Sequence, residues 1–350
     1  MRFTSVAAAL AAATLTALPV SAAVALDDVT EVCRFSDDRL TEISGMTYSQ
    51  RHPDVIYLHN DSSGGPFIYA VDSTTCRTLA TLTLDGIEAR DIEAIGSGRD
   101  RRGRPILWIA DVGDNRDSWP EVRLHRVREP RALTDRALTV KTYRFTYPDR
   151  PHNAEAILSD PTSPRVWIVT KQSARGSLYA LPNVMETSGL HIAERVGRTG
   201  AFVTDGSIRP DGAGFALRDY VDAQVFAGLP PGEESQRVYL PIQFQGEAMT
   251  WTSDAAALLV ASERDDRLLR IDLASIAVST PTLTPDVTGS PEPSEPSARP
   301  EEAETTPDQT GGEASGIPWA PMGLAAVGVA CVGILLGLIG VRRRRGGRSG

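Results

Sequence analysis

Carboxylates recur where short apolar runs open, and this spacing is the main chemical signal in the chain. Five such openings follow one another after 49, 62, 51 and 41 residues: Ser44-Gly45-Met46, Glu93-Ala94-Ile95, Glu155-Ala156-Ile157, Gly206-Ser207-Ile208 and Glu247-Ala248-Met249. Acids that share a small volume repel one another and raise each other's pKa values unless a cation lies among them. A fold that gathers these openings would therefore create a cation site or an acid–base pair.

We expect seven acids to be ligands of a hard cation of the Ca²⁺ type, because that ion prefers carboxylate and carbonyl oxygens. They are Asp91, Glu93, Asp111, Asp114, Glu155, Asp205 and Glu247. No Cys/His cluster has the spacing of a zinc site. Residues 111–117 alternate oxygen-bearing side chains but lack the spacing of the helix-loop-helix calcium motif. The alternative is that these acids cap strand ends and accept hydrogen bonds from backbone amides.

A second set of polar residues ends the following apolar runs: Asp61, Asp111, Lys171, Arg218 and Glu263. A Lys and an Arg beside carboxylates can hold an anionic group such as phosphate, or can form internal ion pairs. We expect substrate contacts from four residues in and near this set: His59, Asp61, Lys171 and Arg218.

The catalytic residues are not defined by any local motif. No Gly-x-Ser-x-Gly elbow is present. Glu155 and Glu247 are the candidates for an acid and a base in hydrolysis of a glycoside or a phosphoester.

The repeat predicts an all-β fold, a β-propeller, because units of this length built from short strands typify propellers. Five blades fit best, six are possible, and a β-sandwich is the rival. Long helical patterns are absent, which argues against an α/β fold. The fifth unit lacks a fourth strand, and residues 29–35 are suited to supply it. That closure would bring Cys33 close to Cys76, and a pair of cysteines in an oxidising compartment predicts a disulfide.

Both ends of the chain differ in composition from the repeats. Residues 1–25 have the apolar run and small-residue cleavage pattern of a signal peptide. Residues 322–341 carry no charge and are followed by four Arg residues, which predicts one membrane-spanning helix with a cytoplasmic tail. The expected divisions are signal peptide 1–25, extracellular propeller 26–278, Pro/Thr/Ser/Glu-rich stalk 279–317, transmembrane helix 318–341 and basic tail 342–350.

Charge limits the partners. The formal net charge is −9, and it becomes −15 without Arg2 and the five Arg residues of the tail. An external domain this acidic repels nucleic acid and attracts cations. We therefore expect no nucleic-acid partner, a contact with the cell membrane through the C-terminal helix, and a small-molecule or cell-surface ligand.

Several segments resemble secreted bacterial β-propellers of the phytase-like and esterase-like families. The resemblance spans residues 42–273 and is carried by Glu42-Ile43-Ser44-Gly45-Met46, Leu58-His59-Asn60-Asp61-Ser62, Ala89-Arg90-Asp91-Ile92-Glu93, Asp111-Val112-Gly113-Asp114-Asn115, Asn153-Ala154-Glu155-Ala156 and Gln245-Gly246-Glu247-Ala248. It implies a calcium-dependent phosphoesterase or a related hydrolase. The alternative is a surface module that binds a ligand without catalysis.

Overall fold

The computed structural model describes residues 21–22, 29–61 and 64–273. All of them belong to one compact unit, Met1–Thr282. The predicted stalk, transmembrane helix and tail lie outside the described residues, as does nearly all of the predicted signal peptide. Within the described part of the chain, no helix is long and apolar enough to cross a membrane.

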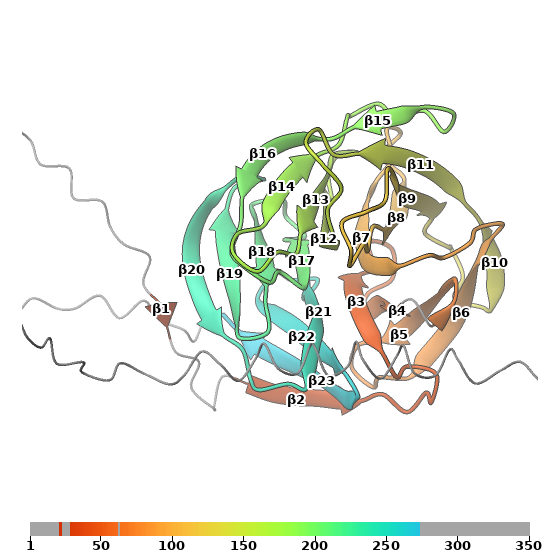
Figure 1. Ribbon diagram of the computed structural model, residues 1–350. Helices are drawn as coiled ribbons and strands as arrows, with labels where there is room; N and C mark the ends of the chain where they lie inside the picture. Colours follow the sequence, from red (N-terminus) through yellow and green to blue (C-terminus); the bar gives the residue numbers. More distant parts are fainter. Residues whose placement is uncertain (1–20, 23–28, 62–63, 274–350) are drawn as a thin grey trace, which may run out of the picture. The chain divides into compact units, whose positions relative to one another are not determined.

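Five antiparallel sheets stand around a common axis, as Figure 1 shows, so the predicted five-bladed propeller is confirmed. Blade 1 consists of β3 (Ile43–Tyr48), β4 (Val55–Asn60), β5 (Phe67–Asp72) and β6 (Thr78–Asp85). Blade 2 consists of β7 (Ile92–Arg99), β8 (Pro105–Asp111), β9 (Val122–Arg128) and β11 (Lys141–Thr146). Blade 3 consists of β12 (Ala154–Ser159), β13 (Val166–Thr170), β14 (Ser177–Ala180) and β16 (Glu194–Arg198).

The last two blades follow the same order from the axis outward. Blade 4 consists of β17 (Asp205–Ile208), β18 (Gly214–Arg218), β19 (Asp222–Ala227) and β20 (Glu233–Tyr239). Blade 5 consists of β21 (Gln245–Trp251), β22 (Ala257–Glu263), β23 (Asp265–Asp272) and β2 (Val29–Arg34). Three short strands add parallel edges to β6, β11 and β20: β10 (Arg136–Thr139), β15 (Leu190–Ile192) and β1 (Ser21–Ala22).

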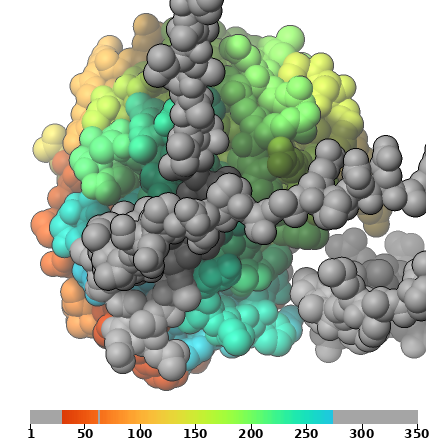
Figure 2. Space-filling model, turned by 90° about the vertical axis from the view of Figure 1, so that its left-hand side faces the viewer, coloured from red at the N-terminus to blue at the C-terminus, as the bar shows by residue number. Residues whose placement is uncertain are grey.

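The ring closes as the sequence predicts. The N-terminal strand β2 pairs with β23 and completes the last blade. In Figure 2, red atoms of the first strands lie beside blue atoms of the last blade. The predicted disulfide joins Cys33 of β2 to Cys76 of blade 1, with Cα atoms 5.6 Å apart. Closure of this kind leaves no long open sheet edge at the point where the chain ends meet.

The apolar core lies between the blades. Five clusters of buried side chains fill the five spaces between neighbouring blades. The inner strands β3 and β12 are buried along their whole length, because both of their faces pack against adjacent blades. Each large buried side chain contributes roughly 1.5–3 kcal/mol, so this packing fixes where the strands begin.

The direction of the inner strands defines two ends of the propeller. All five inner strands start at one end and turn into the second strands at the other, because each blade repeats the same antiparallel order. The second strands therefore finish at the end where the inner strands start. The two predicted sets of polar residues consequently share one end of the channel.

Candidate functional site: an acidic channel mouth

Six carboxylates collect where the inner strands begin and the second strands end. We call this group the acidic mouth: Asp61, Asp91, Glu93, Glu155, Glu247 and Glu263. Four of its members are buried, with Glu93, Glu155, Glu247 and Glu263 each exposed by 5% or less. The convergence of distant acids that the repeat predicts is therefore present in the structure.

Asp61, Asp91 and Glu93 form the tightest cluster of the mouth. One oxygen from each lies within 4.8 Å of the other two. Asp61 follows β4 of blade 1, whereas Asp91 and Glu93 open β7 of blade 2, so the cluster joins two blades. Ser44 of β3 lies beside it and donates a hydrogen bond from Oγ to Oε2 of Glu93 at 3.5 Å.

Gly113 shapes the space around this cluster. A Cβ atom at position 113 would lie 2.5 Å from Oδ2 of Asp91 and 2.6 Å from Oε1 of Glu93. The backbone of Gly113 also donates to the carbonyl of Asp91 at 3.1 Å. Only glycine lets the 111–117 loop approach the two carboxylates this closely, and three hard oxygen donors in such a space suit a cation that prefers oxygen.

Lys171 connects the other half of the mouth. Its Nζ lies 3.2 Å from Oε1 of Glu155 and 3.5 Å from Oε1 of Glu247. Tyr220 donates its hydroxyl to Glu247 at 3.0 Å, and Gln245 donates its amide to the same carboxylate at 3.1 Å. One ammonium group thus serves two buried carboxylates, and the carboxyl groups of the mouth outnumber it.

Burial and mutual repulsion shift the acids toward their protonated forms. Burial, reinforced by Glu155, Asp61 and Asp91, holds the pKa of Glu93 well above its usual value. Burial raises the pKa of Glu155 to about 7, against the opposing effect of Lys171. The pKa of Glu263 rises to about 8 through burial and the neighbouring Glu247. Burial alone would lower the pKa of Lys171, yet Glu155, Tyr220 and Glu247 outweigh it and raise the pKa.

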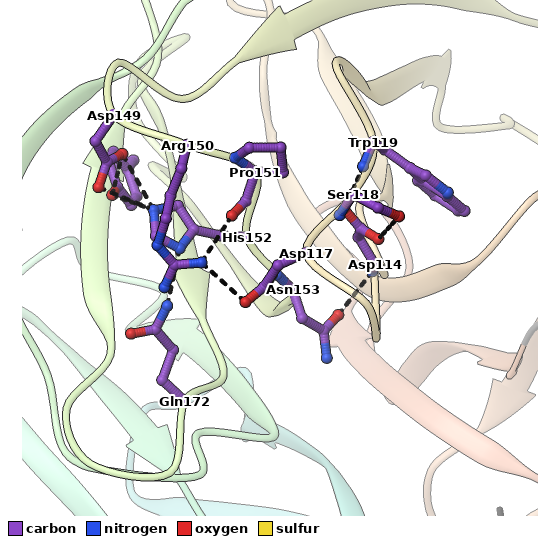
Figure 3. A network of polar contacts seen from close by, with 11 residues as sticks. Asp114, Asp117, Ser118, Trp119, Asp149, Arg150, Pro151, His152, Asn153 and Gln172 are labelled. Atoms are coloured by element: carbon purple, nitrogen blue, oxygen red, sulfur yellow. Dashed lines mark hydrogen bonds and ion pairs between the residues drawn. The ribbon is translucent and has the colours of Figure 1, made fainter.

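A network of loop residues holds Asn153, and Asn153 in turn fixes Glu155. Asn153 donates its side-chain amide to Oε1 of Glu155 at 3.0 Å. Asn153 is itself held by the backbone amide of Asp114 and by the carboxylate of Asp117, each at 2.8 Å (Figure 3). Arg150 donates to the same Asp117 at 2.9 Å. The loop at residues 111–117 thus positions Glu155 through its hydrogen bonds to Asn153.

Three of the seven expected metal ligands are occupied by hydrogen bonds outside the cluster. Asp111 accepts a hydrogen bond from the backbone amide of Asp91 at 2.8 Å. Burial alone would raise the pKa of Asp111, but the neighbouring His125 and the Asp91 amide outweigh burial and lower it. Asp114 accepts from the backbone amides of the loop at residues 118 and 119. Asp205 accepts from the backbone amides of residues 206 and 249 at 2.7 Å, which ties blade 4 to blade 5. These three acids match the alternative in which the carboxylates cap strand ends and accept hydrogen bonds from backbone amides.

Two of the expected substrate ligands are also turned inward. His59 is 1% exposed, its Nδ1 lies 2.9 Å from the carbonyl of Asn60, and burial lowers its pKa to about 4. Arg218 is 1% exposed and donates to the carbonyls of Ala248 and Ala261 in blade 5. Burial lowers the pKa of Arg218 to about 10. Lys171 and Asp61, by contrast, lie in the mouth.

Glu263 was expected only to end an apolar run, and two residues that donate to Glu247, Tyr220 and Gln245, were missing from the expected site. Tyr220 stands two residues after the end of β18, where an aromatic residue is indistinguishable from a packing residue in the sequence. Gln245 opens β21 two residues before Glu247, a position that the family resemblance contains but to which no role was attached. In the sequence, the only indication that either residue belongs to the site is its position near the end of a strand.

Comparison with known proteins finds only distant structural likenesses. No protein-family model matches the chain, and no curated protein sequence matches it. Among solved structures, a PQQ-bound aldose sugar dehydrogenase from Streptomyces coelicolor is 11% identical, covers 70% of this chain and 97% of its own, and has a TM-score of 0.41. Glutaminyl cyclase from Myxococcus xanthus is 9% identical, covers 73% and 97%, and has a TM-score of 0.44. Raptor from Chaetomium thermophilum is 12% identical, covers 69% and 29%, and has a TM-score of 0.38.

These likenesses carry no argument about activity at such identities and TM-scores. The assignment as a five-bladed propeller rests on the strand pairing itself. The resemblance to phytase-like and esterase-like propellers agrees with the fold, and the particular family stays a prediction.

Proposed function

We propose that the protein is a membrane-anchored, cell-surface propeller hydrolase whose acidic mouth binds a divalent cation of the Ca²⁺ type. The observation that carries this proposal is the approach of Asp61, Asp91 and Glu93 to within 4.8 Å, next to the Lys171-bridged pair Glu155 and Glu247. The substrates we favour are esters of phosphoric or carboxylic acids.

The residues present fit such an ion. The donors are hard carboxylate oxygens, Gly113 leaves room beside two of them, and the buried acids outnumber the one ammonium group of the mouth. Asp61, Asp91 and Glu93 would hold the ion. When bound, it would polarise the ester and offset the repulsion among the acids.

The remaining residues divide the acid–base work. With a pKa of about 7, Glu155 is half ionised near neutral pH and is suited to take a proton from a water molecule. Asn153 holds this carboxylate in place. Lys171 can hold the negative charge that develops on an ester oxygen, and Tyr220 lies 3.0 Å from Glu247, where its hydroxyl can orient that second carboxylate.

One observation favours a second candidate, a surface module that binds a partner. Four large apolar side chains are exposed on connections at the end of blades 4 and 5 that carries the acidic mouth. They are Phe202, Val221, Ile242 and Phe244, with Ile242 97% exposed. Exposed apolar groups gathered on one face are typical of protein interaction sites.

A panel of chromogenic phosphate and carboxylate esters tests the hydrolase. We expect turnover that requires Ca²⁺, stops with chelator, and falls about 100-fold or more in Glu155→Gln, in line with loss of a general base. The matched control is Glu194→Gln on the exposed strand β16, which should retain full activity. Turnover unaffected by Glu155→Gln would remove Glu155 from this role, and no turnover on any ester would favour the binding module.

A further inference from the structure

A second charged site of opposite sign lies at the other end of the propeller. A groove of about 430 Å³ runs along blade 2 and β10, and we call it the basic groove. Its charged lining residues are Asp100, Arg104, Arg126, Arg128, Arg136 and Lys141. The β7–β8 turn, the end of β9 and the start of β11 contribute all of these residues except Arg136, and these three segments lie opposite the acidic mouth. Arg136 comes from β10, which pairs with β6 of blade 1.

The positive charge of this groove is not balanced by its own acid. Asp100 is bound to Arg104, from Oδ2 to Nε at 2.8 Å, and it also accepts from the backbone amides of residues 102 and 104. Among the described residues, none forms a salt bridge with Arg126, Arg128, Arg136 or Lys141. Four cations therefore face one groove in a chain whose net charge is −9.

The strand register places like charges of this groove beside each other. Lys141 of β11 stands directly opposite Arg126 of β9. Like charges at directly opposed positions of an antiparallel pair are destabilising. Alternation along β9 also places Arg126 and Arg128 on the same face of the strand. Violations of such local rules concentrate at functional sites.

Arg126 is held in a fixed position for a ligand. Its guanidinium carbon lies 5.5 Å from the ring centre of Trp108 and 5.3 Å from that of Tyr143. Both rings are buried, and the indole Nε1 of Trp108 is a buried donor that has no hydrogen-bond partner among the residues that the structure describes. A guanidinium packed against aromatic rings loses little side-chain entropy when it binds an oxyanion in bidentate fashion.

We propose that the basic groove binds a compact ligand that carries two or more phosphate or sulfate groups. Several cations with one preordered Arg suit tetrahedral oxyanions, and the volume suits a small molecule. The acidic remainder of the protein repels long polyanions, so the ligand is compact. This site is independent of the acidic mouth and of its proposed hydrolase activity.

The test uses the full-length protein in a mild non-ionic detergent. Isothermal titration with inorganic tripolyphosphate and, separately, with sucrose octasulfate distinguishes phosphate from sulfate as the preferred group. We expect saturable binding of at least one of them, weakened about tenfold or more in Arg126→Gln/Lys141→Gln, a loss of about 1.4 kcal/mol. Arg195→Gln/Arg198→Gln removes two exposed charges from β16 and should change the affinity less than about twofold, as expected of distant surface charges.

A single variant separates binding from damage to the fold. Lys141→Gln removes the repulsion opposite Arg126, so we expect a higher melting temperature without ligand together with weaker binding. The proposal is overturned if the wild type binds neither probe, or if the β16 control weakens binding as much as the groove variant.

Discussion

The acidic mouth and the basic groove place opposite charges at opposite ends of one propeller, and they differ above all in burial. The mouth holds four carboxylates that are exposed by 5% or less, with Lys171 between two of them. The groove holds Arg128, Arg136 and Lys141 in exposed positions. Charges in a buried site interact through a low dielectric, whereas exposed charges are screened by water and salt.

This difference teaches where charge can be kept without a partner. Buried acids either take up protons or need a cation, so the raised pKa values of Glu93, Glu155 and Glu263 are the expected response of the mouth. Exposed cations can remain charged without a partner, because water screens them and the loss of folding free energy is small. Substitutions in the mouth should therefore affect stability more than the same substitutions in the groove.

The largest expected effect is that of Lys171→Met. Removal of the ammonium leaves Glu155 and Glu247 buried without their cation, so we expect a loss of about 3–5 kcal/mol in the free energy of unfolding at pH 8. Urea denaturation measures it, and the loss should shrink at pH 5, where Glu155 is protonated. The matched control is Lys141→Met in the groove, expected to stay within about 0.5 kcal/mol. Equal effects of the two variants would refute the contrast in burial.

The pH dependence of stability is the next largest effect. The pKa of Glu155 is about 7 and that of Glu263 about 8 in the folded state, against 4.5 for an ordinary glutamate. The folded protein thus binds more protons than the unfolded chain between these values, so stability is fully present below pH 4.5 and falls as the pH rises to about 8.

In chelator, we expect the melting temperature to drop across that window, and the free energy of unfolding to fall by roughly 3 kcal/mol through Glu155. Millimolar Ca²⁺ should abolish most of the drop, because a bound ion stabilises the ionised acids. A melting temperature that rises with pH in chelator, or that does not change when Ca²⁺ is added, would contradict a cation site in the mouth.

Gly113→Ala should act on the mouth alone. The added methyl group would lie 2.5–2.6 Å from oxygens of Asp91 and Glu93, so these carboxylates must shift. We expect Ca²⁺ affinity to fall about tenfold, which corresponds to about 1.4 kcal/mol. Gly189→Ala is the control, because its Cβ would meet nothing closer than 3.5 Å. Unchanged affinity in Gly113→Ala would place the ion elsewhere.

Salt should produce the smallest and most selective effect. The exposed groove should lose tripolyphosphate affinity as NaCl rises from 50 to 200 mM, while the buried mouth should keep its Ca²⁺ affinity within about threefold. Titrations of both ligands in the same buffers make the comparison. A steeper salt dependence of Ca²⁺ binding than of tripolyphosphate binding would contradict the view that the mouth is shielded from salt and the groove is not.

The repeated openings were sufficient to predict the fold, the closure by β2 and the Cys33–Cys76 disulfide, because strand spacing and cysteine number directly constrain a ring. The collection of Glu93, Glu155 and Glu247 at one end followed from the same repeat. The hydrogen-bonding direction of each acid did not. Asp205 resembles Glu247 in its place in the repeat, yet its shorter side chain accepts from the backbone amides of Gly206 in blade 4 and Met249 in blade 5.

Sequence position also failed to separate the two basic members of the second set. Lys171 directly follows the second strand of blade 3 and Arg218 is the last residue of the second strand of blade 4. Arg218 nevertheless donates to backbone carbonyls of blade 5, whereas Lys171 contacts two carboxylates. The basic groove was not predicted, because its residues come from the β7–β8 turn, the end of β9, β10 and the start of β11, which only the strand register brings together. Pairings between strands of different blades have no local signature.

The most direct measurement is a calorimetric titration of Ca²⁺ into the chelator-treated, full-length protein and into Glu93→Gln. We predict one saturable site in the wild type, weakened about tenfold or more in Glu93→Gln because a central carboxylate ligand is lost. Arg126→Gln/Lys141→Gln should bind Ca²⁺ as the wild type does. No saturable binding to the wild type, or equal binding to Glu93→Gln, would contradict a cation site formed by Asp61, Asp91 and Glu93.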